Sequence, residues 1–492
     1  MLPSSFTRLA GKANFLLLVS SLFLFISVFI LILPRPSPCP SPGFLSDTLP
    51  LRHTGGVGDG SGAAPTAVRH LVFGLASSAR SFPHRRRYIR SWWDTSRMRG
   101  FVFLDSPLSV EDATANVNAN VNASEPPIRI SADVSGLPYT FPGGGLRSAV
   151  RVARVARELV GAAEGMEGVR WVVLGDDDTV FFPENLAATL RRHDWEQWHY
   201  VGSSSEAVVQ NEKYSFDMAF GGGGFALSWP LARALARVLD SCLVRYAHLY
   251  GSDARIFSCL AELGVGLTRD LGFHQVDLRG DIFGMLTAHP LTPLVSLHHL
   301  DNVEPIFPGM DRVQALEHLF TAVAADPGRI LQQTVCYDRL ALQTVSISWG
   351  YAVQVFSGNH LLRDVLTWQK TFMPWKRGRS ASSSHYMFNT RAFPKDPCAR
   401  PAIFFLEGVA FGVDEIYTNY SRHTTESCLG NRTSMNLKRI KVSSRFLFLG
   451  SGQLVAPRRH CCDILPSSGE VMEIKIRECG DELIAMLPMV GN

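Results

Sequence analysis

Short apolar segments alternate with amphipathic ones from about residue 70 onward. The segments HLVFGLAS (70–77) and RGFVFLD (99–105) have the length and composition of buried strands, and the basic segment FPHRRRYIRSWWD (82–94) between them predicts a helix. Apolar residues at helical spacing over 146–163 predict a second helix, which the strand VRWVVLGDDD (169–178) follows directly. Strands that alternate with helices indicate a mostly parallel sheet with helices on both faces.

The pattern changes in the last third of the chain. In the part of the chain before this change, two helices are predicted over 184–192 and 230–246, with a glycine-rich turn at 221–224 between them. After it, TVSISWGYAVQVF (344–356) and SSRFLFLG (443–450) alternate as strands do. We therefore expect an α/β domain followed by a smaller β-rich C-terminal region.

The N-terminal segment predicts a membrane anchor. Residues 15–33 form an uncharged apolar run of the length that a helix needs to cross a bilayer. A cleaved signal peptide is the alternative, but its apolar core is usually shorter and ends at a small-residue cleavage site. Arg8 and Lys12 precede the run and favour a cytosolic N-terminus. The predicted organisation is a cytosolic tail (1–14), a single transmembrane signal anchor (15–33), a flexible Pro/Gly/Ser-rich stem (34–68), the α/β domain (69–332) and a β-rich, cysteine-containing C-terminal domain (333–492).

Composition and charge exclude some classes of protein and indicate the compartment in which the chain folds. The chain has 492 residues, of which 46% are hydrophobic, and a net charge of +4, so nucleic-acid binding has no electrostatic support. Nine cysteines, without a C-x-x-C pair or a zinc-like spacing, suit an oxidising compartment, although their pairing cannot be deduced from the sequence. Three glycosylation sequons, at Asn122, Asn419 and Asn431, lie on the predicted lumenal side.

The acidic triplet Asp176-Asp177-Asp178 is the main chemical signal. Adjacent carboxylates raise one another's pKa unless a cation neutralises them. If the backbone there is extended, Asp176 and Asp178 project to one side and offer two oxygens to a hard divalent ion such as Mn²⁺ or Mg²⁺. The alternative is a solvated acidic turn, but the apolar strand before the triplet and the VFF after it favour a metal site. An EF-hand calcium site is excluded because its spacing is missing.

A family resemblance rests on this triplet and on two longer segments. WVVLGDDDTVF (171–181) resembles the DxD motif of the fringe-like glycosyltransferases, which belong to the β-1,3-glycosyltransferase superfamily. VGSSSEAVVQNEKYSFDMAFGGGGFALS (201–228) and GFHQVDLRGDIFGMLTAHPLTPLVSLHHLD (272–301) are similar to the plant branch of that group known as domain of unknown function 604. The resemblance covers about residues 70–308. It implies a GT-A type fold, which is a Rossmann-like mixed sheet with flanking helices, a UDP-sugar donor, Mn²⁺, inversion at the anomeric carbon and a type II Golgi membrane topology.

The resemblance also implies roles for individual acidic residues. Asp178 would be the principal metal ligand, and Asp176 would lie near the donor ribose or a metal-bound water. Asp253, in GSDARIF, stands where relatives carry the base that deprotonates the acceptor hydroxyl. The chain departs from relatives with an acidic pair at this place, because residue 252 is Ser. A Ser-Asp pair that opens a helix is also an N-cap signal, and the two roles are compatible.

Two histidines are candidates for a third metal ligand. His274 in GFHQVD matches the Phe-His element of fringe-like enzymes, and His298 in VSLHHLD resembles the Val-Ser-Phe-His run of the related core 1 galactosyltransferases. In the simplest scheme only one of them is the ligand. For either histidine, the alternative is a hydrogen-bonded core residue.

Further positions are candidates for substrate contacts. Those predicted to meet the donor lie at strand ends, in the triplet or at the start of the helix before it: Ala76, Ser77, Asp105, Arg147 and Asp177. Those predicted to shape the sugar and acceptor pocket are Asp217 and the glycines of the GG-GF turn, Gly222, Gly223 and Gly224. That turn lacks the lysine of a phosphate-binding P-loop, and a plain flexible turn is its alternative.

Together these features predict an inverting, metal-dependent glycosyltransferase of the Golgi membrane with a lumenal catalytic domain. It would move a sugar from a UDP-sugar to a hydroxyl of a glycan, a glycoprotein or another acceptor, with a β-1,3 linkage. A catalytically silent sugar-binding or scaffold protein on the same fold is the competing hypothesis, because a fold does not guarantee an activity.

Overall fold

A computed structural model describes most of the chain beyond residue 63. The described residues are 64–114, 125–140, 147–338, 340–377, 385–423, 436–466 and 469–481. The predicted anchor, most of the predicted stem and the sequons at Asn122 and Asn431 lie outside them. Within the described part, no helix has the length and apolar character needed to cross a membrane.

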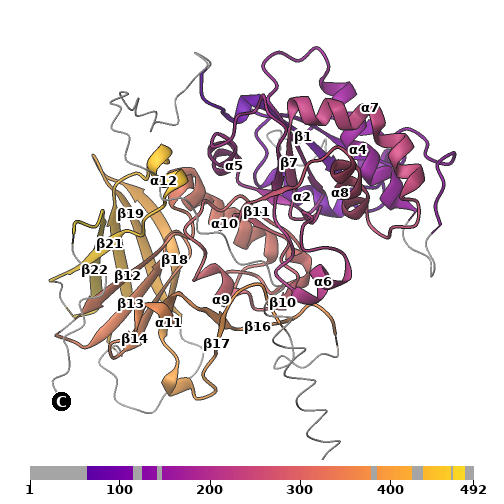
Figure 1. The fold of residues 1–492 in the computed structure, drawn as a ribbon. Coiled ribbons are helices and arrows are strands. Elements are labelled where there is room, and N and C mark those ends of the chain that lie inside the picture. Colours follow the sequence, from indigo (N-terminus) through magenta and orange to yellow (C-terminus); the bar gives the residue numbers. More distant parts are fainter. Residues whose placement is uncertain are drawn as a thin grey trace, which may run out of the picture. The chain divides into compact units, whose positions relative to one another are not determined.

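The first large element is a seven-stranded mixed sheet (Figure 1). In spatial order its strands are β3 (Ile128–Ile130), β2 (Arg99–Leu104), β1 (Leu71–Ala76), β4 (Trp171–Asp176), β7 (Phe225–Ser228), β6 (Tyr200–Gly202) and β8 (Leu267–Arg269). Pairings are parallel from β3 through β4 and between β6 and β8, whereas β7 runs antiparallel to both of its neighbours. The prediction of a mostly parallel sheet is confirmed.

Helices cover both faces of this sheet, which explains why β1 is apolar at every position. One face packs against α4 (Ser148–Ala163), α7 (Trp229–Arg245) and α8 (Ser252–Glu262), and the other against α2 (Phe82–Arg90) and α5 (Pro183–Leu190). Successive residues of β1 divide accordingly, with Val72 in the first core and Phe73 in the second. The helices predicted over 82–94, 146–163, 184–192 and 230–246 are all present within a few residues.

Further helices lie before, between and after the strands of this sheet. They are η1 (Val68–His70), α3 (Val110–Thr114), α6 (Val208–Lys213), α9 (Phe283–Leu286), η2 (Leu300–Asn302), α10 (Arg312–Ala325) and η3 (Pro327–Arg329). A three-stranded sheet, β5 (Val180–Phe181), β11 (Ser296–Leu297) and β9 (Phe273–His274), follows the acidic triplet. The capping box of α10, in which Asp311 accepts from the Gln314 N–H and Gln314 accepts from the Asp311 N–H, fixes where that helix begins.

An eight-stranded sheet is the largest sheet in the described part of the region after residue 332. In spatial order its strands are β12 (Gln333–Asp338), β13 (Gln343–Ser348), β14 (Ala352–Ser357), β18 (Ala402–Phe411), β19 (Ile416–His423), β20 (Arg439–Ser444), β22 (Val471–Arg477) and β21 (Cys461–Leu465). The remaining elements of this region are α11 (Leu362–Leu366), β15 (Trp368–Lys370), β16 (Phe372–Pro374), β17 (Thr390–Ala392), η5 (Pro397–Ala399) and α12 (Ser451–Val455). The predicted β-rich character of this region is confirmed.

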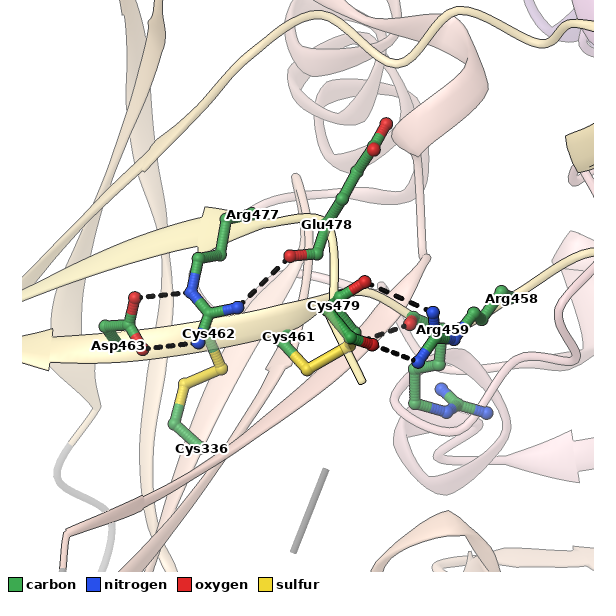
Figure 2. The surroundings of a disulfide bond; sticks show 10 residues. Cys336, Arg458, Arg459, Cys461, Cys462, Asp463, Arg477, Glu478 and Cys479 are labelled. Carbon is green, nitrogen blue, oxygen red and sulfur yellow. Dashed lines mark hydrogen bonds and ion pairs between the residues drawn. A yellow bond between two sulfur atoms is a disulfide. The ribbon is translucent and has the colours of Figure 1, made fainter. Parts of the chain in front are cut away.

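Disulfides bring the two outer strands of this sheet together. Cys336 of β12 is bonded to Cys462 of β21 with a Cα–Cα distance of 5.5 Å, so the sheet curls until its first and last strands meet. The neighbouring Cys461 is bonded to Cys479, and Figure 2 shows the two bonds leaving β21 in different directions. Adjacent residues of a strand face opposite ways, which lets each cysteine reach a different partner. A further disulfide, Cys242–Cys259, ties α7 to α8.

The predicted strand over 443–450 is wrong beyond Ser444, where β20 ends. After Ser444 the backbone forms hydrogen bonds with side chains instead of with another strand. The Leu447 N–H donates to the Asp326 carboxylate, and the Arg445 carbonyl accepts from the Arg329 guanidinium. Phe446 and Phe448 in this segment are exposed.

Candidate functional site

Three adjacent parallel strands end at one edge of the mixed sheet. Ala76 at the end of β1 lies in register with Asp176 of β4 on one side and with Phe103 of β2 on the other. The loops that follow these strands therefore start side by side, as expected for a ligand-binding edge of an α/β sheet. They carry Ser77, Asp105 and the acidic triplet.

The Asp177 side chain points toward the loop between β1 and α2 and toward the start of α2. Its carboxylate accepts hydrogen bonds from the hydroxyls of Ser77 (2.6 Å) and Ser81 (2.8 Å) and from Nη1 of Arg85 (2.9 Å). It is 2% exposed. Both oxygens are thus used to tie β4 to the loop between β1 and α2, so the prediction that Asp177 and Ser77 contact the donor is not supported by their contacts.

Asp176 and Asp178 face the other way, toward His298. Nε2 of His298 lies 3.0 Å from Oδ1 of Asp178 and 3.8 Å from Oδ2 of Asp176. One ligand atom from each of the three residues lies within 4.8 Å of the others, which is compact enough to hold a single ion. Asp178 and His298 are buried, while the Asp176 side chain is 39% exposed.

The pKa values of the three residues reflect this crowding. Burial of the carboxyl group and the nearby carboxylates of Asp178 and Asp177 together raise the pKa of Asp176 to about 7, against the opposing effect of His298. Burial would also raise the pKa of Asp178, but His298 and Arg85 outweigh it and hold that pKa below its usual range. For His298, burial lowers the pKa, yet the carboxylates of Asp178 and Asp176 dominate and bring it to about 9.

A backbone carbonyl orients the His298 ring in the way expected for a metal ligand. Its Nδ1 lies 3.3 Å from the carbonyl of Gln275, and an N–H there donates to that oxygen and leaves Nε2 directed at the carboxylates. A histidine that binds a metal commonly donates its second ring N–H to a carbonyl in this manner. Two carboxylate oxygens and one imidazole nitrogen suit Mn²⁺, and also the harder Mg²⁺, if water and phosphate complete the shell. The donor set therefore fits a divalent ion.

Arg85 supplies the positive charge nearest to the triplet. Besides Asp177, its guanidinium reaches Oδ2 of Asp178 at 3.3 Å and Oδ2 of Asp301 at 3.6 Å. Burial lowers the pKa of Arg85, but the surrounding carboxylates raise it above its ordinary value, so the side chain stays charged. From the sequence, Arg85 was only the first member of a basic triplet on a predicted helix. Its partners come from loops far along the chain.

The glycine-rich turn joins three parts of the site. The Gly221 N–H donates to Asp253 (3.3 Å), the Gly222 carbonyl accepts from the Thr179 hydroxyl (2.7 Å), and the Gly223 N–H donates to the Gln275 side chain (2.7 Å). Gly224 has a φ of +79°, and a β-carbon there would lie 2.6 Å from the Phe181 ring.

Asp253 lies in the first turn of α8, one residue inside the helix, whose N-cap is Gly251. Its carboxylate accepts from the N–H groups of Gly221 and Ala254. Burial nevertheless raises the pKa of Asp253, which moves it toward the range of a useful base. The N-cap interpretation is wrong, whereas the assignment as a base stays a prediction.

The structure does not bring His274 to the carboxylates. Nδ1 of His274 lies 3.1 Å from Oε1 of Glu206, and Nε2 lies 2.9 Å from Nε2 of His289. With both ring nitrogens occupied by buried side chains, His274 is a hydrogen-bonded core residue, which was its alternative. Of the two candidate histidines, only His298 joins the cluster.

Arg147 does not reach the strand ends, whereas Arg151, one helical turn later, does. Arg147 is exposed at the N-terminus of α4. Arg151 is buried and donates to the carbonyls of Ser77 (2.6 Å) and Phe103 (3.3 Å). Arg151 was not predicted as a site residue, although its position four residues before Val155 puts a charge on the apolar face of the helix, which is a signal that could have identified it.

Of three further predicted positions, two are exposed and one is half-buried. Asp217 is exposed, and its backbone N–H donates to the hydroxyl of Ser215. Asp105 is also exposed and accepts from the Ala79 N–H at 2.8 Å, which folds the loop after β1 over the end of β2. Asn419 is half-buried in β19 between two paired strands.

A cavity of about 360 Å³ connects the cluster to Asp253. Its polar lining includes Asp176, Asp253 and His298 together with Gly221 and Gly222. Its other lining includes four aromatic residues, of which Trp375 belongs to the region after residue 332: Tyr214, Phe220, Tyr250 and Trp375. The sequence did not single out any of the four. The volume lies within the usual range for small-molecule sites.

The fold and this site define a mixed α/β protein with a candidate divalent-metal centre at the carboxyl edge of its sheet. A family model described as "Protein of unknown function, DUF604" matches residues 210–462, just over half of the 492-residue chain. The chain belongs to the DUF604 family.

Comparisons with curated sequences and with solved structures add less than the family model does. No curated protein sequence matches the chain. Two similar solved structures are of the galactosyltransferase LgtC, one in complex with donor and acceptor sugar analogs and one an active-site mutant. Each is 13% identical with a TM-score of 0.33 and covers 50% of this chain, and the match spans 95% and 94% of the two LgtC chains.

Proposed function

We propose that this protein is a divalent-metal-dependent glycosyltransferase with a GT-A type fold, which uses a UDP-sugar as donor. One observation carries the proposal: Asp176, Asp178 and His298 form one cluster, and Asp176 and His298 line a cavity that is also lined by Asp253, a carboxylate with a raised pKa. The resemblance of the segments around these residues to fringe-like glycosyltransferases supports it.

Asp178, Asp176 and His298 would hold the ion. When bound, Mn²⁺ or Mg²⁺ would neutralise negative charge on the diphosphate of the donor as UDP departs. Arg85 now neutralises Asp177 and Asp178, and its guanidinium also suits a phosphate oxygen. Arg151 keeps the ends of β1 and β2 together beneath this part of the site.

Asp253 would act as the general base. An acceptor hydroxyl in the cavity gives its proton to the Asp253 carboxylate while its oxygen bonds to the anomeric carbon. The bond from that carbon to the phosphate oxygen breaks, and its electron pair leaves with UDP. Attack opposite the leaving group inverts the anomeric carbon. Base catalysis of this kind contributes roughly 10²–10⁴-fold.

The proposal extends to location and linkage. A signal anchor at residues 15–33 would place the described domain in the Golgi lumen as a type II membrane protein. The disulfides Cys242–Cys259, Cys336–Cys462 and Cys461–Cys479 are consistent with an oxidising compartment, and glycosylation at the sequons would accompany it. The β-1,3 linkage and a hexosyl or N-acetylhexosaminyl donor follow from the resemblance alone.

Release of UDP tests the proposed activity. The full-length protein is incubated with Mn²⁺ and each of a set of UDP-sugars, with and without Asp178→Ala. We expect release with at least one donor and a loss of at least 100-fold in the variant. If wild-type protein releases UDP from none of the donors and Asp178→Ala leaves UDP affinity unchanged, the protein is a non-enzymatic member of its fold.

A further inference from the structure

The region after residue 332 contributes a side chain to the substrate cavity. β16 pairs antiparallel with β10 (Leu278–Gly280), with Pro374 opposite Leu278, and Arg279 donates to the Pro374 carbonyl at 2.9 Å. This register places Trp375, the next residue, beside Asp277. A second attachment, the antiparallel bridge between Ala207 and Tyr386, holds the chain at a point further along the sequence than Trp375.

Trp375 completes a stack of three rings that begins at the candidate metal centre. The centroids of His298 and His299 are 3.8 Å apart, and those of His299 and Trp375 are 4.3 Å apart, with only 14° between the last two ring planes. His299 has a φ of +54°, an uncommon conformation for a histidine, and its Nδ1 lies 3.3 Å from Oδ1 of Asp277. The indole is thus held in place at the wall of the cavity, where it is half-buried.

A second aromatic group lines the cavity near the proposed base. The rings of Tyr214 and Tyr250 stack with centroids 6.0 Å apart, and the Lys213 ammonium lies 4.7 and 5.3 Å from their centroids. Tyr250 precedes Asp253 by three residues, in the loop that leads into α8. Polar side chains in the same lining are Gln210, Asp253, Gln275 and Asp277.

This combination suits a neutral sugar. A pyranose ring has an apolar C–H face, which packs on an aromatic ring, and hydroxyls at its edge, which donate to carboxylates and amides. The carboxylates of Asp253 and Asp277 disfavour a phosphate in this part of the cavity. The diphosphate of a donor therefore belongs near the cationic Arg85, and the aromatic part remains for the acceptor.

We propose that Trp375 is the platform on which the acceptor stacks, and that the acceptor is a carbohydrate. This inference rests on the proposed function and deepens it, because it names the acceptor class and gives the C-terminal region a role in recognition. Trp375 lies outside the part of the chain that resembles fringe-like enzymes, so this platform is a separate addition to the site.

Saturation-transfer NMR with simple glycosides tests the platform. The full-length protein, with Mg²⁺ and UDP, is titrated with the methyl glycosides of galactose, glucose, N-acetylglucosamine, mannose and xylose. Trp375→Ala is compared with Trp375→Phe, which keeps an aromatic ring, and with Trp198→Ala, which removes an exposed indole outside the cavity lining. UDP affinity is measured for every protein by calorimetry.

We expect at least one glycoside to bind wild-type protein with saturation concentrated on the C–H protons of one face. Trp375→Ala should weaken that binding at least tenfold, Trp375→Phe by less than threefold, and Trp198→Ala not at all, with UDP affinity within threefold in all. Unchanged glycoside binding in Trp375→Ala, or no glycoside binding by wild-type protein that binds UDP, overturns the inference alone. Failure of wild-type protein to bind UDP overturns the proposed function and this inference with it.

Discussion

The ring of His298 occupies the space that a side chain at Gly222 would need. A β-carbon at Gly222 would lie 2.1 Å from Cε1 of His298, far inside contact distance. The glycine is therefore required by the position of the histidine, and the GG-GF turn and the candidate metal centre form one packed unit.

Gly222→Ala should displace His298 and weaken the metal centre. Overpacking a tight site costs about 1–3 kcal/mol, and a shifted imidazole should lower Mn²⁺ affinity at least tenfold. Electron paramagnetic resonance of free Mn²⁺ measures the affinity. Gly221→Ala is the matched control, because a β-carbon there would meet nothing closer than 3.7 Å. Equal Mn²⁺ affinity in the two variants would contradict the steric argument.

Substitution of Asp177 should mainly reduce stability, whereas substitution of the adjacent Asp176 should mainly weaken metal binding. Asp177→Ala leaves the donors of Ser77, Ser81 and Arg85 without their acceptor, which should lower the free energy of unfolding by about 2–5 kcal/mol. Asp176→Asn changes a side chain that is 39% exposed, where water screens its charge, and should change stability by less than about 1 kcal/mol while weakening Mn²⁺ binding. Urea denaturation and Mn²⁺ titration of both variants provide the comparison. A greater loss of stability in Asp176→Asn would refute it.

Asp253→Asn should slow transfer by roughly 10²–10⁴-fold and raise stability at neutral pH. A carboxyl whose folded pKa is raised binds its proton more tightly in the folded state, so its contribution to stability is present below the unfolded pKa of about 3.8 and is lost as pH rises through the folded pKa. The neutral amide avoids that loss. Thermal unfolding at pH 7 should therefore occur at a higher temperature in the variant, with the difference vanishing near pH 4. A lower unfolding temperature at pH 7 would show that the charged form is the favoured one.

Removing the Cys336–Cys462 bond should loosen the C-terminal sheet. The bond joins the outer strands across 126 residues of chain, and a disulfide over so long a segment typically stabilises by about 2–5 kcal/mol. Cys336→Ser with Cys462→Ser should lower the denaturant midpoint followed by the fluorescence of the region's buried tryptophans. Cys242→Ser with Cys259→Ser, which opens a segment of 17 residues, is the comparison. An unchanged midpoint in the first pair would mean that packing alone closes the sheet.

Local patterns predicted the first half of the fold well, because each buried strand and amphipathic helix is encoded within a short segment. The same logic placed Asp176 and Asp178 on one side of the strand end and Asp177 on the other. What could not be predicted depends on long-range pairing. Trp375 reaches the cavity through the register of β16 on β10, and Cys336 meets Cys462 through the curvature of eight strands.

The two histidines show the same limit. His274 is the last residue of β9 and His298 directly follows β11, and the two strands are parallel neighbours in register, with Leu297 opposite His274. Only their surroundings separate them: Glu206 and His289 engage His274, while Asp178 faces His298. A periodic pattern says that a residue is buried, but not which buried partner it meets.

Titration of Mn²⁺ in the presence of UDP tests the central claim most directly. Wild-type protein, Asp178→Asn, His298→Gln and His274→Gln are titrated under identical conditions and checked for folding by circular dichroism. We predict that Asp178→Asn and His298→Gln each weaken Mn²⁺ binding at least tenfold and that folded His274→Gln stays within threefold of wild type. Mn²⁺ binding that survives loss of Asp178 and His298 unchanged would contradict a metal centre formed by these residues, and with it the proposed basis of catalysis.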